Sequence, residues 1–167
     1  MAAQTHTAFV ALGANIGEPL RQIEAAFAAL AALPGTRVLA RSSLYRSAPV
    51  GYADQPDFIN AVAMIETALA PHALLDALLA IERAHGRIRE FPNAPRTLDL
   101  DIVLYGDVVL QEPGLTIPHA RMLERAFVML PLAEIAPDAV VPGQGRVSDL
   151  ARRVDAASVA QLQKILV

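Results

Sequence analysis

Two aspartates, Asp99 and Asp101, stand two residues apart in a stretch whose side chains alternate between apolar and polar. This period of two predicts a β-strand that directs both carboxylates to one face, about 7 Å apart along the chain. Carboxylates this close repel each other unless a positive group lies between them. Oxygen-only donors favour magnesium or manganese over zinc. The pair therefore indicates either a divalent-metal site or a solvated strand face, and by itself it does not separate the two.

Three arginines precede the pair, at Arg87, Arg89 and Arg96. Guanidinium groups bind phosphate oxygens bidentately, and magnesium held by carboxylates bridges others, so the combination suits a polyphosphate ligand. Phosphoryl transfer needs mainly positioning and charge neutralisation from a protein. Two carboxylates on one strand face could also hold two metal ions about 3.5–4 Å apart. The alternative is that these arginines are ordinary surface charges.

The elements that would position these groups follow from the hydrophobic pattern. Strands are expected over 8–12, 38–46, 59–66 and 98–104. Helices are expected over 19–33 and from Pro71 to an end at His85-Gly86. The order strand, helix, strand, strand, helix, strand is that of a ferredoxin-like βαββαβ core with an antiparallel sheet, in the α+β class. Connection rules place the third strand between the first and second, and the fourth on the free side of the first.

This topology brings the chemically unusual stretches to one rim of the sheet. They are the turn 13–17, the loop after 47, the segment 58–60, the strand start 96–101 and the arginines after the second helix. Gly13-x-Asn15-x-Gly17 is compatible with phosphate binding and with a plain strand-to-helix turn. Glu82 interrupts the apolar stripe of the second helix, so it lies either at the helix edge or where a ligand binds.

C-terminal helical and β additions are expected after the core. The pattern predicts a small β extension at 107–110, an extended segment at 115–119 and a helix over 120–135 that Pro131 must break or kink. A further helix is expected from 148 to 154, and a last element over 159–167.

Composition limits the classes of function. The chain has 167 residues, 54% of them hydrophobic, and no cysteine, so we expect a single domain over 1–167 without disulfides or thiolate metal sites. No apolar run approaches the ~20 residues of a membrane span, and the first residues do not resemble a signal peptide. The formal net charge of −3 argues against broad nucleic-acid binding. A cytoplasmic protein with no membrane or nucleic-acid partner is the expectation.

Several motifs resemble those of the 6-hydroxymethyl-7,8-dihydropterin pyrophosphokinase family of folate biosynthesis. The similarity covers nearly the whole chain, in order, up to about Pro142. The motifs are Phe9–Gly17, Ser42–Pro49, Asp54–Ala61, Ile81-Glu82 with Gly86-Arg87, Arg96–Ile102, Thr116–His119, Arg125–Phe127 and Pro131–Pro137.

The resemblance implies transfer of pyrophosphate from ATP to the hydroxymethyl oxygen of the pterin, with AMP leaving. It implies that Asp99 and Asp101 hold two Mg²⁺ ions and that Arg87 and Arg96 neutralise charge during attack. The residues implied at the ATP are Glu82, Arg87, Arg89, Arg96, Ile102, Thr116, His119 and Arg125. ATP and the pterin would be the partners of a monomer.

The resemblance also implies a pterin site. Phe58 and Phe127 would stack on the two faces of the ring, Asn60 would pair with its amide edge, and Ser47 and Val50 would contribute from the preceding loop. Family members often carry Tyr at Phe58, Pro at Ala48 and an aromatic residue at Ala120. In some relatives a Trp and another Arg cover ATP, whereas the loop 90–94 here contains only Phe91 as an aromatic residue and Gly114 stands at the Arg position.

Two other functions share parts of this pattern. A nucleotidyltransferase palm also carries paired aspartates on a ferredoxin-like sheet, but it releases pyrophosphate instead of AMP. A ferredoxin-like RNA-binding module would need exposed aromatic residues on its central strands and a basic sheet face. The first strand offers Phe9, the third offers no matching aromatic residue, and the chain is net acidic.

Overall fold

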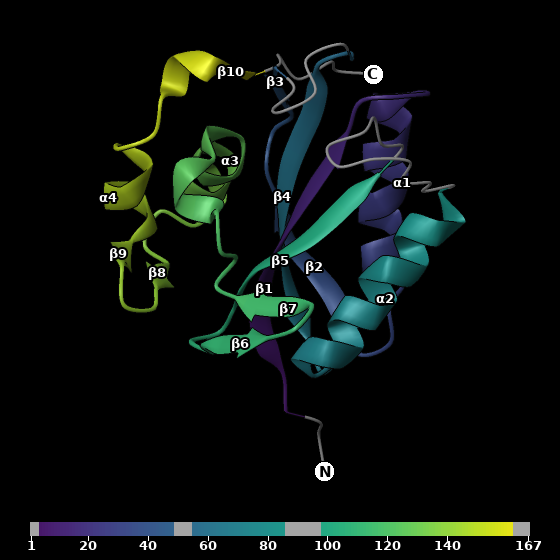
Figure 1. Ribbon diagram of the computed structural model, residues 1–167. Helices are drawn as coiled ribbons and strands as arrows, with labels where there is room; N and C mark the ends of the chain where they lie inside the picture. The colour runs from purple at the N-terminus through teal and green to yellow at the C-terminus, as the bar shows by residue number, and fades with distance from the viewer. Residues whose placement is uncertain (1–3, 49–54, 86–97, 162–167) are drawn as a thin grey trace.

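A six-stranded antiparallel sheet lies between two helical layers (Figure 1). The structure is a computed structural model that describes residues 4–48, 55–85 and 98–161. The sheet consists of β1 (His6–Ala14), β2 (Thr36–Arg41), β3 (Tyr45–Ser47), β4 (Phe58–Thr67), β5 (Asp99–Tyr105) and β10 (Val159–Gln161). Its order is β10-β3-β4-β1-β5, with β2 also paired to β4.

The strand pairing agrees with the expectation from chain order. β4 lies between β1 and the β2–β3 segment, and β5 pairs with the free side of β1. The strand expected over 38–46 is interrupted, because the Ser42 hydroxyl accepts the Val62 backbone N–H at 2.9 Å while Ser42 N–H bonds the Val62 carbonyl. A side-chain hydroxyl thus replaces a backbone acceptor and separates β2 from β3.

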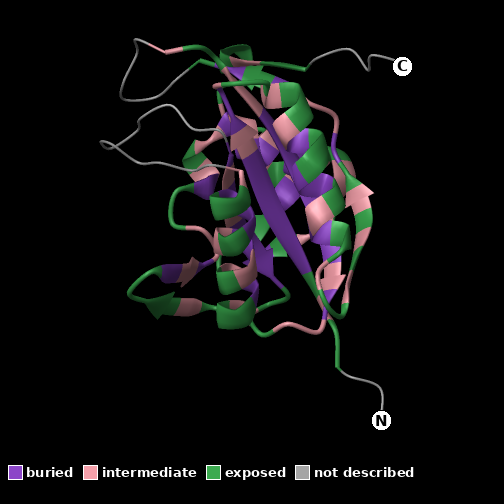
Figure 2. Cartoon of the chain, turned by 90° about the vertical axis from the view of Figure 1, so that its right-hand side faces the viewer, coloured by how far each residue is buried: buried purple, intermediate pink, exposed green. Residues whose placement is uncertain are grey.

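One face of the sheet, here called the α1 face, is covered by α1 (Pro19–Ala31) and α2 (Pro71–Ala84). Both helices begin with a proline, whose missing N–H has no partner to lose in a first turn. Their buried stripes pack on alternate residues of the strands, so the sheet is buried between its covers while the outer helix faces are exposed (Figure 2). The buried residues of this layer include Ile23, Phe27, Leu30, Leu74, Leu78, Val10, Leu12, Ile65, Leu100 and Ile102.

The opposite face, here called the α3 face, is covered by α3 (Ala126–Ile135) and α4 (Val147–Ala151). The expected helix over 120–135 is instead a 3-10 turn, η1 (Met122–Glu124), followed by α3. α3 does not end at Pro131, because Met129 and Leu132 beside it are buried against the sheet and this packing offsets one missing hydrogen bond.

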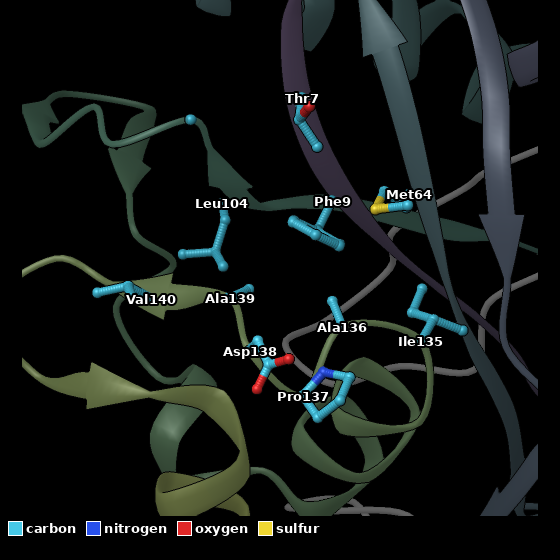
Figure 3. A pocket seen from close by; sticks show the side chains of 11 residues that line it. Thr7, Phe9, Met64, Leu104, Ile135, Ala136, Pro137, Asp138, Ala139 and Val140 are labelled. Carbon is cyan, nitrogen blue, oxygen red and sulfur yellow. The ribbon is translucent and has the colours of Figure 1, made fainter.

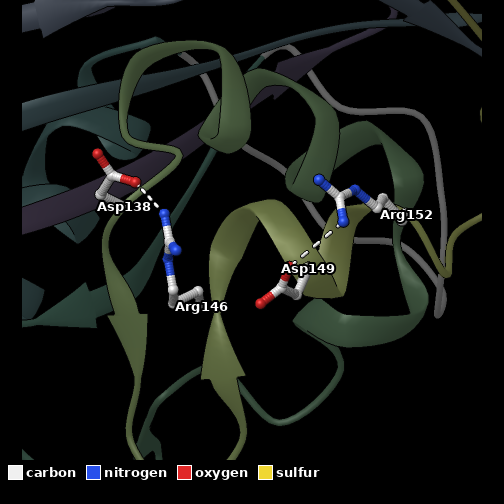
Figure 4. Close-up of polar contacts among 4 residues, drawn as sticks. All are labelled: Asp138, Arg146, Asp149 and Arg152. Atoms are coloured by element: carbon white, nitrogen blue, oxygen red, sulfur yellow. Dashed lines mark hydrogen bonds and ion pairs between the residues drawn. The ribbon is translucent and has the colours of Figure 1, made fainter.

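The remaining additions are short. β6 (Leu110–Glu112) and β7 (Leu115–Ile117) form a hairpin, and β8 (Val140–Val141) pairs with β9 (Gly145–Arg146). Arg146 is ion-paired with Asp138, and Arg152 with Asp149 at 3.5 Å (Figure 4). These exposed pairs contribute little to stability. η2 (Ala156–Ser158) leads into β10, which pairs with β3 and extends the sheet.

The buried α1-face stripe should dominate stability. Leu78→Ala removes a fully buried side chain and should lower the free energy of unfolding by about 2–5 kcal/mol. Leu39→Ala, at a position 39% exposed, is the matched control and should cost less than about 1 kcal/mol. Urea unfolding of both variants measures the difference; equal losses would contradict this description of the core.

Candidate active site

Four residues from four strands lie in one transverse row. Tyr45 pairs with Asn60, Asn60 with Gly13, and Gly13 with Asp99, so the row runs across β3, β4, β1 and β5. Residues directly opposite each other in a sheet share a face. Because the next pairs along, such as Ala11 with Val62, pack under α3, the row lies on the α3 face.

The two aspartates of β5 point to this same face. Asp101 pairs with Ala11 and Asp99 with Gly13, while Leu98, Leu100 and Ile102 are buried on the α1 face. The predicted alternation is therefore confirmed up to Ile102. Beyond it a register shift against β1 turns Leu104 to the α3 face, so the continuation of the pattern to Leu104 was wrong. Both aspartates are only half-buried. The Ile102 side chain points into the core and away from them, so only its backbone could reach a ligand on the α3 face.

Glu82 lies under the aspartate pair. Its side chain is 1% exposed, and its Oε2 accepts the backbone N–H of Leu100, the residue between the aspartates, at 2.7 Å. In the described sheet β5 is an edge strand, so this N–H has no ladder partner and the carboxylate takes that place. The charged residue that looked out of place in the α2 stripe thus secures the strand that carries both aspartates.

His119 adds an imidazole at the same end of the face. Its backbone N–H donates to the Val103 carbonyl at 3.0 Å, and its Nδ1 accepts the Arg121 backbone N–H at 3.2 Å. In the neutral ring the proton is therefore on Nε2, which can donate. Burial lowers the pKa of His119, Arg125 and Arg121 lower it further, and Asp99 opposes them. His119, Arg125 and Asp99 are therefore electrostatic neighbours. Thr116, in β7, is half-buried, and the bond between Ile117 and Pro118 is cis.

Asn60 lies at the other end of the row, and its side chain is 4% exposed. Its Nδ2 donates to the Ser47 hydroxyl at 2.7 Å and to the Tyr45 carbonyl at 3.4 Å. Its Oδ1 is directed toward Gly13 and accepts no hydrogen bond within the described part of the chain. A buried amide oxygen in this situation favours a bound donor.

Gly13 leaves space on the sheet between Asn60 and Asp99. A Cβ built on Gly13 would lie 3.4 Å from Asn60 Oδ1 and 4.0 Å from Phe58 Cδ1. The half-buried ring of Phe58 thus borders the same space. In the sequence Gly13 is only part of a turn. Its importance becomes visible when Asn60 and Asp99 are known to be its strand partners.

Phe127, in the first turn of α3, is half-buried against the α3-face core. The guanidinium carbon of Arg125 lies 5.5 Å from the centroid of its ring, within the range of a cation–π interaction. Arg125 thus contacts Phe127 and acts electrostatically on His119. It lies between the residues implied for ATP and those implied for the pterin.

The turn before α1 is held by Asn15, whose side chain is 1% exposed. Its Nδ2 donates to Gln55 Oε1 at 2.7 Å and to the Pro56 carbonyl at 3.0 Å. The side chain therefore ties the 13–17 turn to the segment that leads into Phe58. This is the structural role that the Gly-x-Asn-x-Gly pattern allowed.

Four of the predicted site residues lie outside the described ranges: Val50, Arg87, Arg89 and Arg96. Most of the others form two groups on or beside the α3 face, whereas the Ile102 side chain points into the α1-face core and Thr116 lies in the β6–β7 hairpin. Asp99, Asp101, His119 and Arg125 lie toward β5, with Glu82 behind them; Ser47, Phe58 and Asn60 lie toward β3, with Phe127 on the covering helix.

The carboxylate pair fits a hard divalent cation. Within 4–48, 55–85 and 98–161 there is no group of three or more His, Cys, Asp or Glu side chains that could hold a metal ion. Mg²⁺ requires fewer protein ligands, since it is commonly bound by one or two carboxylates together with substrate phosphates and water. In the same ranges no helix is long and apolar enough to cross a membrane.

A hollow of about 460 Å³ lies at the other end of the same face, next to Phe9 and Leu104 (Figure 3). Its lining is mostly apolar, and its one carboxylate, Asp138, is ion-paired with Arg146. It therefore lacks the donor and acceptor groups that gather around Gly13.

The chain is similar to one family of enzymes along most of its length. The family model for 7,8-dihydro-6-hydroxymethylpterin-pyrophosphokinase (HPPK) matches residues 9–137. A 2-amino-4-hydroxy-6-hydroxymethyldihydropteridine pyrophosphokinase of Pseudomonas aeruginosa is 54% identical over 134 residues, covering 80% of this chain and 83% of that protein. The Haemophilus influenzae protein of the same name is 48% identical over 147 residues, covering 88% of this chain and 92% of that protein.

Solved structures share the fold at low identity. A crystal structure of Plasmodium falciparum HPPK-DHPS with pterin and p-hydrobenzoate has a TM-score of 0.69 at 15% identity, covering 90% of this chain and 44% of that one. Another, with STZ-DHP, has a TM-score of 0.73 at 14% identity, covering 89% of this chain and 43% of that one. This chain thus spans less than half the length of those proteins. The family model matches most of the chain, and the chain covers 83% and 92% of the Pseudomonas aeruginosa and Haemophilus influenzae relatives. It therefore belongs to the 7,8-dihydro-6-hydroxymethylpterin-pyrophosphokinase family and is a pyrophosphokinase of folate biosynthesis.

Proposed function

We propose that the enzyme transfers pyrophosphate from ATP to the hydroxymethyl oxygen of 6-hydroxymethyl-7,8-dihydropterin and releases AMP. The observation that carries this proposal is the row on the α3 face, with carboxylates at one end, an amide and an aromatic ring at the other, and Gly13 between them. Residues opposite each other on adjacent strands are about 5 Å apart, so Asn60 and Asp99 are separated by roughly 10 Å. That distance allows a flat ring to bind at Asn60 while the phosphates joined to it in the reaction bind at Asp99.

At the phosphate end, Asp99 and Asp101 would hold two Mg²⁺ ions. When bound, these ions would neutralise the triphosphate and polarise its β-phosphorus. Neutral His119 would donate a hydrogen bond from its Nε2–H to the nucleotide, and Arg125 would contribute a fixed positive charge. Arg87, Arg89 and Arg96 would bind the phosphates through their guanidinium groups, as the resemblance also implies. Thr116 and the Ile102 backbone would be further nucleotide contacts.

At the pterin end, Asn60 Oδ1 would accept an N–H from the ring edge, since its Nδ2 is already held by Ser47. Phe58 from β4 and Phe127 from α3 would stack on the two faces of the ring. The preceding loop, including Val50, would complete the edge contacts. Glu82 would act from below by fixing β5.

Two alternatives are weaker. A nucleotidyltransferase palm would place its aspartates similarly but would release pyrophosphate, so analysis of the products separates the two. An RNA-binding sheet would use Phe9, which is only 6% exposed beneath the α3 layer.

We further propose that the sheet with α1 and α2 is a ferredoxin-like core with C-terminal additions, in a single-domain, cytoplasmic monomer.

The metal assignment predicts the effect of removing one charge. Asp99→Asn and Asp101→Asn should each lower the rate of AMP formation more than about 100-fold, which exceeds the effect typical of a residue that only hydrogen-bonds to a metal ligand. ³¹P NMR of a reaction with ATP, Mg²⁺ and the pterin identifies the products. Asp107→Asn, at an exposed position just after β5, is the matched control and should keep full activity. Full turnover in both site variants would refute the assignment.

The Gly13 space predicts selective loss of pterin binding. Gly13→Ala would place a methyl group beside Asn60 Oδ1 and the Phe58 ring, so the KM for the pterin should rise about 10- to 100-fold. The Kd for a non-hydrolysable ATP analogue should change little. Steady-state kinetics and calorimetry measure the two quantities. An unchanged pterin KM would show that the ring does not bind over Gly13.

The environment of His119 predicts a titration. In the metal-free protein its NMR midpoint should lie below 6.5, because burial and Arg125 favour the neutral ring. Asp99→Asn removes the opposing charge and should lower the pKa further, whereas Arg125→Gln should raise it. Since the folded state favours neutral His119, protonation at acid pH should cost stability. His119→Gln assigns the resonance; shifts of the opposite sign would contradict the placement of these charges.

A further inference from the structure

Glu134, near the end of α3, accepts hydrogen bonds from two residues of the β2–β3 connection. Its two carboxylate oxygens each lie 3.0 Å from the Ser43 backbone nitrogen, and Oε2 lies 2.8 Å from the Ser43 hydroxyl. Oε1 accepts the Tyr45 hydroxyl at 2.7 Å. Glu134 is exposed, but Tyr45 is only 7% exposed, so one end of this cluster is buried. The cluster joins α3 to the start of β3.

Tyr45 is suited to remain a donor. Burial raises the pKa of its hydroxyl, and the hydrogen bond and charge of Glu134 raise it further, so the proton stays in place at any working pH. Hydrogen bonds to a charged acceptor are stronger than neutral ones. The Tyr45–Glu134 contact is thus a durable link between helix and sheet.

Tyr45 belongs to the row that carries the site. It pairs with Asn60, and its carbonyl accepts the Asn60 Nδ2 at 3.4 Å. Two residues later along the strand, the Ser47 hydroxyl accepts a hydrogen bond from the same Asn60 nitrogen at 2.7 Å. Both groups that orient the Asn60 amide therefore come from the three-residue strand that Glu134 holds.

The other end of the link is Phe127. Phe127 and Glu134 are seven residues apart in α3, which is two helical turns, so they lie on the same side of the helix about 10.5 Å apart. A short helix moves as a unit. Fixing Glu134 against β3 therefore fixes the height of the Phe127 ring above the sheet.

We propose that Glu134 and Tyr45 are positioning residues for the pterin: together they set the distance between Phe127 and the sheet and the orientation of the Asn60 amide. This inference rests on the proposed function, because the ring that Phe127 and Asn60 contact is the pterin. Neither residue needs to touch the substrate.

Tyr45→Phe tests the inference, with Tyr105→Phe as the matched control. Tyr105 is 2% exposed, and its hydroxyl donates a hydrogen bond to the Leu69 carbonyl at 2.5 Å. The control variant therefore also loses one hydrogen bond of a buried tyrosine. It pairs with Ala8, toward the end of the sheet remote from the row. Both variants should lower Tm, so Tyr105→Phe controls for a loss of stability without a change near the row.

Only Tyr45→Phe should weaken pterin binding. We expect the Kd of 6-hydroxymethylpterin, titrated with Mg²⁺ and a non-hydrolysable ATP analogue, to rise about fivefold, as expected for one hydrogen bond. The pterin KM should rise in parallel, with kcat and the ATP KM changed less than about twofold. Glu134→Gln keeps one acceptor oxygen and should resemble Tyr45→Phe, while Glu134→Ala, which removes all the bonds, should have a larger effect.

The outcomes separate the two proposals. If the wild-type protein binds no pterin, the proposed function fails. If it binds pterin and Tyr45→Phe retains wild-type affinity, as Tyr105→Phe should, the link is only structural and this inference is overturned. Should Tyr45→Phe not fold, Glu134→Gln and Ser43→Ala provide the same comparison, because each removes part of the cluster at an incompletely buried position.

Discussion

The register of β1 against its two neighbours determines where every group on the α3 face lies, since Gly13 pairs with Asn60 on one side and with Asp99 on the other. A slip of one residue in either pairing would turn that strand's polar groups into the α1-face core. The core resists such a slip, because Leu98, Leu100 and Ile102 are buried under the helices by the same alternation that exposes the aspartates. The packing of the core therefore fixes the strand register, and the register fixes the positions of the site residues.

The edge of the sheet needs its own support. In the described structure β5 has a neighbour on one side only, and a strand with two carboxylates on one face gains nothing from their mutual repulsion. The buried Glu82 carboxylate accepts the free N–H between them. A buried carboxyl group is costly without hydrogen bonds, and the bond from the Leu100 N–H offsets part of that cost while it holds β5 in place.

The α3 layer contributes in a different way. It brings Phe127 and Arg125 to the α3 face from a part of the chain remote in sequence, and Glu134 bonds it to Ser43 and Tyr45 at the start of β3. The family model matches residues 9–137, a range that includes α1 and α2 on one face and α3 on the other. The apolar hollow next to Phe9 uses the same face but has none of these polar groups.

Local patterns in the sequence were sufficient for most elements of the core and for their order. The period of two identified β5 and the common face of Asp99 and Asp101, the prolines marked the starts of α1 and α2, and connection rules gave the pairing of β1, β4 and β5. These features depend on near neighbours in the chain and on hydrophobic burial, which a sequence displays directly. The break between β2 and β3 and the continuity of α3 through Pro131 were not predictable, because a hydroxyl–backbone contact to β4 and packing against the sheet decide them.

The site divides in the same manner. The sequence by itself identified the carboxylates and the arginines as chemically unusual, and the resemblance to the family added its aromatic and amide residues. Tertiary structure alone decided that Gly13 separates Asn60 from Asp99, that Glu82 serves the backbone of β5, and that Glu134 joins α3 to Tyr45. Each of these is a contact between residues far apart in the chain, and only the register of the strands and the position of α3 bring such residues together.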